Sequence, residues 1–276
     1  MLRGRSFGSG PTVISGRYRA PMALSRLVEA ASGVWVATSR RYATTSTVLL
    51  DGSGGAVVVD PAWDPDELAA IPADLAALGV DCVAGLATHE HYDHVLWHPD
   101  LGDVPRWSSA GTVAHLSHDR EALLAPLAEF LTPDLIAIAG RLRPLPDGTL
   151  PWSGPQARVV VHDAHAPAHV ALLVEEPGIL VAGDMLSDVE LPMPQGDESL
   201  EHYAVGLEAL RDVVWATRLL IPGHGTVTTA ARVRFDSDRT YLDDLLAGRV
   251  SDDPRIADPE NAGLHAENLE KARLLR

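Results

Sequence analysis

The sequence predicts an α/β fold made of two halves, each of which pairs a β-sheet with helices. Short apolar runs come first in each half, and segments with helical spacing follow them. The chain has 276 residues, of which 46% are hydrophobic, so it can bury a large core as one domain. We expect one domain over residues 22–276 with helices at its C-terminal end, after a flexible leader rich in Gly, Ser and Arg at residues 1–21.

The expected strands are short, apolar segments rich in β-branched residues and bounded by turn residues. They cover residues 34–36, 45–51, 56–60, 81–87, 158–162, 170–174, 179–182 and 219–221. The Gly-rich residues 52–55 lie between the second and third of these segments and predict a hairpin.

The expected helices follow from apolar residues at helical spacing. They cover about residues 64–78, 109–118, 121–131, 199–214, 230–247 and 260–274. Asp64 and Pro65 are typical of a helix start, and we expect Pro72 to bend or shorten the helix that they begin. The Pro and Gly residues between 98 and 155 leave the topology of that segment open.

The composition restricts the partners and the compartment. A net charge of −16 repels phosphate backbones, so we expect a small-molecule substrate and no nucleic acid. The single cysteine, Cys82, excludes an intrachain disulfide, and its apolar neighbours predict a buried position. The sequence has no apolar signal segment and no run of about 18 apolar residues. We therefore expect a cytoplasmic protein without a membrane partner, and the oligomeric state stays open.

One motif concentrates metal-binding side chains directly after an apolar strand. Residues 89–94 read His-Glu-His-Tyr-Asp-His and hold three imidazoles and one carboxylate. Imidazole nitrogens and carboxylate oxygens are ligands of zinc, iron and manganese when no thiolate is present. His89 and His91 are two residues apart in an extended loop and can share one ion, whereas Asp93 and His94 can reach a second position.

Three further candidate ligands follow other apolar strands. They are His165, Asp184 in the sequence Gly183-Asp184, and His224 in Gly223-His224-Gly225. A site for two metal ions needs ligands from more than one loop, so these positions are suited to complete it.

The order of these motifs resembles the metallo-β-lactamase superfamily over about residues 25–245. The resemblance implies a four-layer αββα sandwich and two divalent metal ions, zinc in the first place, with iron or manganese as alternatives. It also implies a ligand set in which His89, His91 and His165 hold one ion, Asp93, His94 and His224 hold the other, and Asp184 bridges them.

The resemblance implies a hydrolase in which a metal-bridging hydroxide cleaves an ester-like bond, such as a thioester or lactone. Asp93 is the candidate catalytic residue, because it can accept the proton of the water or orient the hydroxide. A bridging Asp184 is similar to the ligand set of glyoxalase II and the lactonases, and differs from that of the best-known zinc β-lactamases. However, residues 95–98 lack the glycines of glyoxalase II, and residues 185–188 lack the tyrosine of the lactonases, so the substrate stays open.

Two alternatives remain on the same fold. One is an oxidoreductase with a single iron, similar to the persulfide dioxygenases, and the other is a β-lactam hydrolase. Superfamily members that process RNA are disfavoured by the acidic charge.

Other polar residues near the motifs are expected to support the site or to stand apart from it. Asp60 and Asp163 are candidates for orienting ligand histidines through the second ring nitrogen. We expect no ligand role for Glu90, His98, His162, His169, His265 and Asn268.

Overall fold

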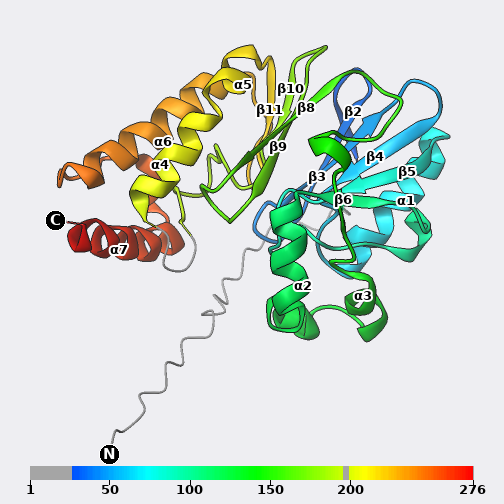
Figure 1. Cartoon of the computed structure of the whole chain (residues 1–276), viewed down its shortest axis with the longest axis horizontal. Helices are drawn as coiled ribbons and strands as arrows, with labels where there is room; N and C mark the ends of the chain where they lie inside the picture. The colour runs from blue at the N-terminus through cyan, green and yellow to red at the C-terminus, as the bar shows by residue number, and fades with distance from the viewer. Residues whose placement is uncertain (1–26, 195–198, 276) are drawn as a thin grey trace, which may run out of the picture.

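The computed structural model describes residues 27–194 and 199–275, so the leader expected at residues 1–21 lies outside the described residues. Two β-sheets face each other, and helices cover the outer face of each (Figure 1). The layers therefore run helices, sheet, sheet, helices, as the four-layer αββα prediction requires.

The first sheet contains seven strands that lie side by side in sequence order. Its first four strands pair antiparallel, and the pairs from β4 to β7 are parallel. The strands are β1 (Val28–Ala31), β2 (Val34–Thr38), β3 (Thr45–Leu50), β4 (Gly55–Val59), β5 (Asp81–Leu86), β6 (Arg106–Ser108) and β7 (Arg143–Pro144).

The second sheet contains four strands in the order β11-β10-β9-β8. Strand β9 pairs antiparallel with both of its neighbours, and β10 pairs parallel with β11. The strands are β8 (Ala157–His162), β9 (His169–Val174), β10 (Ile179–Val181) and β11 (Leu219–Ile221). Strands β8, β10 and β11 therefore all run in one direction, and their carboxyl ends share one edge of the sheet.

The helices divide between the two sheets (Figure 1). The first sheet carries α1 (Pro65–Leu78), α2 (Ala110–Leu124) and α3 (Pro133–Ile138), and the second carries α4 (Leu200–Ala209), α5 (Arg211–Ala216), α6 (Ala231–Leu246) and α7 (Pro259–Leu274). Short 3₁₀ turns are η1 (Pro99–Leu101), η2 (Ala125–Glu129), η3 (Pro146–Gly148) and η4 (Pro254–Ala257). Within the described ranges, no helix combines the length and apolar character needed to cross a bilayer.

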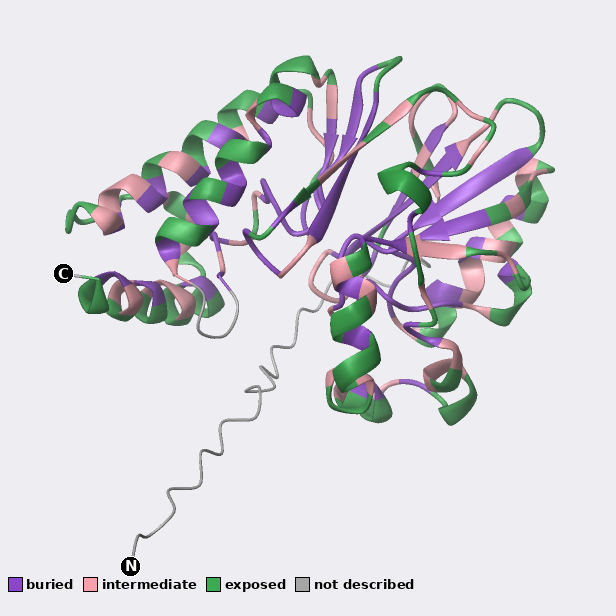
Figure 2. Ribbon diagram, in the orientation of Figure 1, coloured by how far each residue is buried: buried purple, intermediate pink, exposed green. Residues whose placement is uncertain are grey.

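Side chains alternate along the strands and so build three apolar layers. In β4, Val57 and Val59 pack between the two sheets, whereas Val58 packs against the helices of the first sheet. In β9, Leu172 lies between the sheets and Leu173 packs under the helices of the second. Strands buried on both faces are typical of sheets inside a layered sandwich, and Figure 2 shows them buried along most of their length.

The structure corrects several expected helix boundaries. The break expected between the helices at 109–118 and 121–131 is a kink within α2 at Asp119, where φ is −131° and ψ is 23°. The second expected helix is shorter than predicted, because α2 ends at Leu124 and the 3₁₀ turn η2 follows. The helix expected at 199–214 is two helices, α4 and α5, which meet at Leu210. Helix α1 continues through Pro72, because its buried face on both sides of that residue packs into the core.

Cys82 is half-buried and packs against the apolar layer between the first sheet and its helices. Burial raises the pKa of its thiol to about 12, so the thiol is protonated at neutral pH. A protonated thiol is a weak nucleophile and a weak metal ligand, which agrees with a packing role.

Candidate metal centre

All seven residues predicted as metal ligands lie together at one edge of the sandwich. The segment after β5 carries four of them, the turn between β8 and β9 carries one, and the segments after β10 and β11 carry one each. They are His89, His91, Asp93, His94, His165, Asp184 and His224. Strand ends that share an edge thus bring together residues that are far apart in the sequence.

Backbone hydrogen bonds join the two sheets at this edge. The Thr45 amide donates to the Gly223 carbonyl at 2.7 Å, and the Val170 amide donates to the Thr88 carbonyl at 2.7 Å. The Gly225 amide donates to the Ala43 carbonyl at 3.0 Å. These bonds bring the segment of His224 against the first sheet and the turn of His165 against the segment of His89.

The first group of ligand atoms belongs to His89, His91, His165 and Asp184. His91 Nδ1 lies 2.9 Å from His89 Nε2 and 3.1 Å from His165 Nε2. Asp184 Oδ2 lies 3.4 Å from His89 Nε2 and 3.3 Å from His165 Nε2. A tetrahedral zinc ion with bonds of about 2.0–2.1 Å separates its ligand atoms by about 3.3 Å, so this group could hold one ion.

The second group belongs to Asp93, His94 and His224. His94 Nε2 and His224 Nε2 are 3.2 Å apart, and Asp93 Oδ2 lies 3.6 Å and 3.4 Å from them. Asp184 Oδ1 lies 3.0 Å from His94 Nε2, so this carboxylate faces both groups. The second group could therefore hold another ion that shares Asp184 with the first.

The Asp184 carboxylate provides a test of whether this cluster fits metal ions. Its Oδ1 is buried and accepts no hydrogen bond within the described part of the chain. His94 Nε2, at 3.0 Å, offsets the charge of this oxygen only while that imidazole carries a proton, and a buried carboxylate oxygen without a partner is costly. A cation between Oδ1 and the nearby imidazole nitrogens would remove that cost, so the donor set fits a metal.

Two glycines allow the close approach of Asp184 to the histidines. A Cβ atom on Gly223 would lie 2.1 Å from Asp184 Oδ1. Gly183 has a φ of +56°, and a Cβ there would lie 2.4 Å from the His169 ring. A larger residue at position 223 would displace the shared carboxylate, and one at position 183 would displace the His169 ring.

His94 is oriented by Asp60, as the sequence predicted. Asp60 Oδ2 lies 3.0 Å from His94 Nδ1, which leaves the Nε2 lone pair directed at the ligand cluster. The Thr88 amide and hydroxyl both donate to the same carboxylate, at 2.8 Å and 2.7 Å. Asp60 has a φ of +48°, an uncommon backbone conformation for a residue other than glycine, which places its carboxylate between His94 and Thr88.

The second nitrogens of two other histidines have oxygen neighbours. His89 Nδ1 lies 3.0 Å from Thr88 Oγ1, and His224 Nδ1 lies 2.9 Å from the Tyr42 carbonyl oxygen. A carbonyl can only accept, so His224 Nδ1 carries the proton and its Nε2 is free to bind a metal.

His169 supports the cluster without facing its centre. Its Nε2 accepts the Asp184 amide proton at 3.2 Å, and its ring stacks on His89 at a centroid distance of 4.8 Å. His162 stacks on the other face of His169 at 4.6 Å and accepts the Ala164 amide proton. Both are hydrogen-bonded histidines, as predicted, and His169 also fixes the backbone of the shared aspartate.

Charge in the metal-free cluster is balanced by protons on two histidines. Burial alone lowers the pKa of His224, but the carboxylates of Asp184, Glu190 and Asp93 outweigh it and raise the pKa to about 10. Burial also opposes the charged form of His94, yet Asp184, Asp93 and Asp60 hold its pKa well above the usual range.

The pKa values of Asp184, His89 and His91 shift in the opposite sense. Burial alone raises the pKa of Asp184, but His224, His94 and His89 outweigh it and hold that pKa well below its usual range. Burial lowers the pKa of His89 and of His91. These two imidazoles are neutral at pH 7 and can bind a metal without losing a proton.

Several other polar residues are placed away from the ligand atoms. Asp163 was expected to orient a histidine, but its carboxylate accepts the Ala168 amide proton within its own loop. Glu90 faces His115 on α2 at 3.7 Å, and His98 accepts the Asp100 amide proton. His265 and Asn268 on α7 both contact the Tyr241 hydroxyl, which agrees with the prediction that they do not reach the site.

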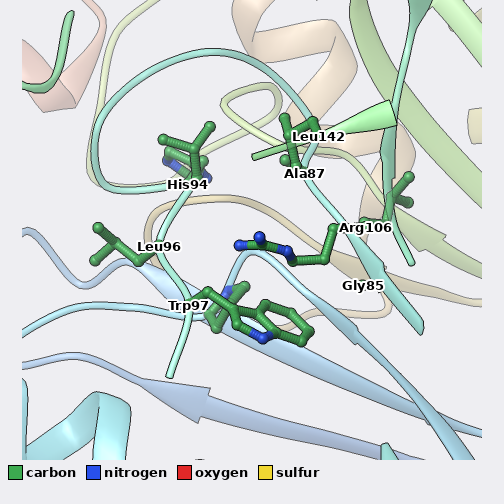
Figure 3. Close-up of a pocket in the computed structure, with 10 residues that line it drawn as sticks. Gly85, Ala87, His94, Leu96, Trp97, Arg106 and Leu142 are labelled. Atoms are coloured by element: carbon green, nitrogen blue, oxygen red, sulfur yellow. The ribbon is translucent and has the colours of Figure 1, made fainter. Parts of the chain in front are cut away.

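A small cavity lies beside the motif segment (Figure 3). It has a volume of about 10 Å³ and is lined by Gly85, Ala87, His94, Leu96, Trp97, Arg106 and Leu142, among others. That volume holds about one water molecule, so the cavity is too small for a substrate. A Cβ on Gly85 would lie 2.6 Å from the Trp97 ring, which shows how closely the motif segment packs on β5.

The sequence reasoning missed Glu190. Its carboxylate groups with Asp184 and His224, with one ligand atom from each residue within 4.8 Å of the others. Glu190 lies six residues after Asp184 and belongs to no motif, so only the path of the loop shows its proximity.

Replacing Asp60 should weaken metal binding beside His94. Asp60→Asn removes the charge that orients the imidazole, and loss of such a partner lowers metal affinity by about 10- to 100-fold. Competition with a chromophoric chelator measures the zinc dissociation constants of the metal-free protein. Asp119→Asn, on the exposed side of α2, is the matched control and should bind as the wild type does. If Asp60→Asn had the same zinc dissociation constants as the wild type, this role of Asp60 would be contradicted.

In the metal-free protein, His94 and His224 should remain charged above the usual titration range of histidine. Folding raises the pKa of His94 and of His224. Their charged rings, paired with the nearby carboxylates, therefore stabilise the fold fully below about pH 6.5. For His224 that contribution is lost as the pH rises through about 10. Nitrogen-15 NMR of the imidazoles at pH 8 should show two imidazolium rings that His94→Gln and His224→Gln remove one at a time. Neutral rings at pH 8 would refute the assignment.

Comparisons with known proteins agree with the fold. The family model described as the metallo-beta-lactamase superfamily matches residues 41–261. A beta-lactamase domain protein from Burkholderia ambifaria is 22% identical with a TM-score of 0.65, and the match covers 93% of this chain and 89% of that one. A search of curated proteins gives no match.

Two other solved structures differ in their described activities. A metallo-beta-lactamase from Pontibacter korlensis is 18% identical with a TM-score of 0.62, over 79% of this chain and 99% of that one. The sec-alkylsulfatase Pisa1 from Pseudomonas sp. is 15% identical with a TM-score of 0.63, over 81% of this chain and 42% of that one. Identities this low establish a shared fold alone. The family match, which covers most of the length of this chain, establishes that the chain belongs to the metallo-beta-lactamase superfamily.

Proposed function

We propose that this protein is a hydrolase that uses two divalent metal ions to cleave an ester-like bond, such as a thioester or lactone, in a small molecule. The observation that carries the proposal is the position of Asp184 between the two groups. Its Oδ2 lies 3.3–3.4 Å from His89, His165 and His224, and its Oδ1 lies 3.0 Å from His94. One carboxylate shared by two groups of ligands is suited to a pair of ions. Zinc is the first candidate for both, with iron or manganese as alternatives.

When bound, such an ion pair supplies a Lewis acid for the bond that breaks and lowers the pKa of water toward 7. The protein's own contribution is to hold the ligand atoms in fixed positions. Most of these side chains are buried, and His94, His89 and His224 each have an oxygen neighbour at the second ring nitrogen. The ligand geometry therefore requires little rearrangement when metals bind.

Asp93 is the proposed catalytic residue. The residue is only 6% exposed, and its Oδ2 lies 3.4 Å from His224 Nε2. The Thr44 hydroxyl donates to the same oxygen at 3.4 Å and helps to hold one orientation. From this position Asp93 can accept a proton from a water at the cluster, or orient that water toward the substrate.

One observation favours a hydrolase with two ions over an oxidoreductase with one iron. An enzyme with one ion needs only the first group of ligands, yet Asp93, His94 and His224 also converge to within 4.8 Å of one another. The net charge of −16 supports a small-molecule substrate and disfavours nucleic acid.

A substrate panel tests this proposal. The purified chain, loaded with two equivalents of Zn²⁺, Mn²⁺ or Fe²⁺, is assayed against thioesters, lactones, β-lactams, alkyl sulfates and phosphoesters while oxygen uptake is recorded. We expect hydrolysis of a thioester or lactone without oxygen uptake. Asp184→Asn should lower kcat/KM by about 100-fold or more, the scale for loss of a group that stabilises transition-state charge.

Asp119→Asn serves again as the control and should keep wild-type activity. Absence of hydrolysis across the panel in all three metal forms would refute the proposal. Turnover that consumes oxygen would assign the chain to the oxidoreductase class, and selective turnover of β-lactams would replace the proposed substrate class.

A further inference from the structure

The loop at residues 185–191, which directly follows the shared aspartate, has a backbone conformation that needs support. Leu186 is buried and has a φ of +63°, a left-handed conformation that is costly for a residue other than glycine. Such a conformation persists only where the surrounding structure holds it. The contacts that hold this loop therefore bear on the metal centre beside it.

Two side chains of the 185–191 loop bind the segment that carries His224. The Ser187 hydroxyl donates to the His224 carbonyl at 2.8 Å and accepts the Glu190 amide proton at 3.0 Å. The Asp188 carboxylate accepts the Thr226 amide proton at 2.8 Å. The loop thus holds the backbone of His224, and a shift of the loop would move that backbone.

Arg255, in η4, holds the backbone of the same loop. Its Nη1 donates to the Ser187 carbonyl at 2.9 Å and to the Glu190 carbonyl at 2.8 Å. The same nitrogen lies 2.7 Å from Asp238 Oδ1, and Asp253 accepts from Nε and Nη2 of the guanidinium. One planar side chain therefore connects the loop to α6, which carries Asp238.

The ion pairs of Arg255 are buried, which bears on their role. The side chains of Arg255, Asp238 and Asp253 are 9%, 2% and 6% exposed. Desolvation offsets much of the Coulomb attraction in a buried ion pair, so such a pair adds little net stability. A guanidinium does, however, present its N–H groups in a rigid plane, and here they fix two carbonyls of the loop. Control of the loop position therefore explains this buried arginine better than stability does.

Asp184 is fixed by a separate contact on another element. The His169 imidazole, in β9, accepts its amide proton at 3.2 Å. Loss of support for the 185–191 loop should therefore act mainly on His224. The metal position formed by Asp93, His94 and His224, called the His224 position, should respond. The one formed by His89, His91 and His165, called the His91 position, should not.

We propose that Arg255 is a positioning residue for His224, and that it acts through Ser187 and the 185–191 loop. The inference rests on the two metal positions of the proposed function. Arg255 contacts no side chain of the predicted ligand set, so its effect passes through the backbone of the loop. The C-terminal part of the chain thereby contributes to the geometry of the metal centre.

A zinc titration of the full metal-free chain, by competition with a chelator, tests this role without using activity. Arg255→Lys keeps the charge beside Asp238, but one ammonium cannot reproduce the planar fork that fixes both loop carbonyls. We expect the zinc dissociation constant of the His224 position to rise by about tenfold, the scale for loss of a group that orients a ligand. The constant of the His91 position should not change. The control Arg239→Lys makes the same substitution in the exposed ion pair with Asp243 on α6 and should bind as the wild type does.

A second variant tests the path and remains available if Arg255→Lys fails to fold. Ser187→Ala removes the hydroxyl that binds the His224 carbonyl and leaves the ion pairs of Arg255 in place. It should weaken the His224 position alone. Because both changes act along one path, the double variant should lose less affinity than the product of the two single effects. A loss equal to that product would refute an action through Ser187.

Nitrogen-15 NMR of the metal-free histidines separates positioning from a general loss of stability. In Arg255→Lys and in Ser187→Ala, the imidazole signals of His224 should move, whereas those of His91 should keep their wild-type positions. An unchanged His224 signal, or an unchanged zinc constant of the His224 position, would overturn the proposal. An equal loss of zinc affinity at both positions would overturn it as well.

The two proposals fail on different results. If the wild type binds two ions and hydrolyses nothing in the substrate panel, the proposed function fails, while the titration still decides the role of Arg255. If both variants keep the zinc constants of the wild type and hydrolysis persists, only the role of Arg255 fails.

Discussion

The candidate metal centre depends on the backbone hydrogen bonds that join the two sheets at a single edge. Thr45 bonds to Gly223 and Val170 bonds to Thr88, so each sheet holds a segment of the other at a fixed distance. The first sheet supplies the four ligands of the motif at residues 89–94, and the second supplies His165, Asp184 and His224. Neither sheet alone carries a complete set, so the two-sheet architecture itself creates the site.

The same architecture concentrates charge where water has little access. Carboxylates and imidazoles share a buried edge, and in the metal-free protein the carboxylates keep protons on His94 and His224. Metal ions that bind there must displace these protons, because an imidazolium has no free lone pair. Protons and metal ions can thus each balance the negative charge of this cluster. Metal binding would therefore depend on pH and would be coupled to folding stability.

The clustering of the candidate ligands could be predicted because their chemistry and their position in the sequence agree. His89 to His94, Asp184 and His224 follow apolar strands, and strand ends in layered α/β folds meet at common edges. Asp60 could be predicted as a support for the same reason, since it directly follows β4. Asp163 also lies next to a strand, but its carboxylate stays within its own loop, which local sequence does not reveal.

Features that depend on distant contacts were beyond sequence reasoning. Glu190 reaches the cluster because Arg255, 65 residues later, holds its carbonyl, and no local pattern encodes that contact. Strands β6 and β7 contain only three and two residues, and they form because β5 offers an edge to β6 and β6 offers one to β7. The helix expected to reach residue 131 ends at Leu124, where the 3₁₀ turn η2 begins.

Diffraction from crystals grown with zinc, recorded on both sides of the zinc absorption edge, tests the central claim most directly. The account predicts two anomalous peaks, one among His89, His91 and His165 and the other among Asp93, His94 and His224. Asp184 should lie between the two peaks, within bonding distance of both. A single peak, or none within bonding distance of these residues, would contradict it.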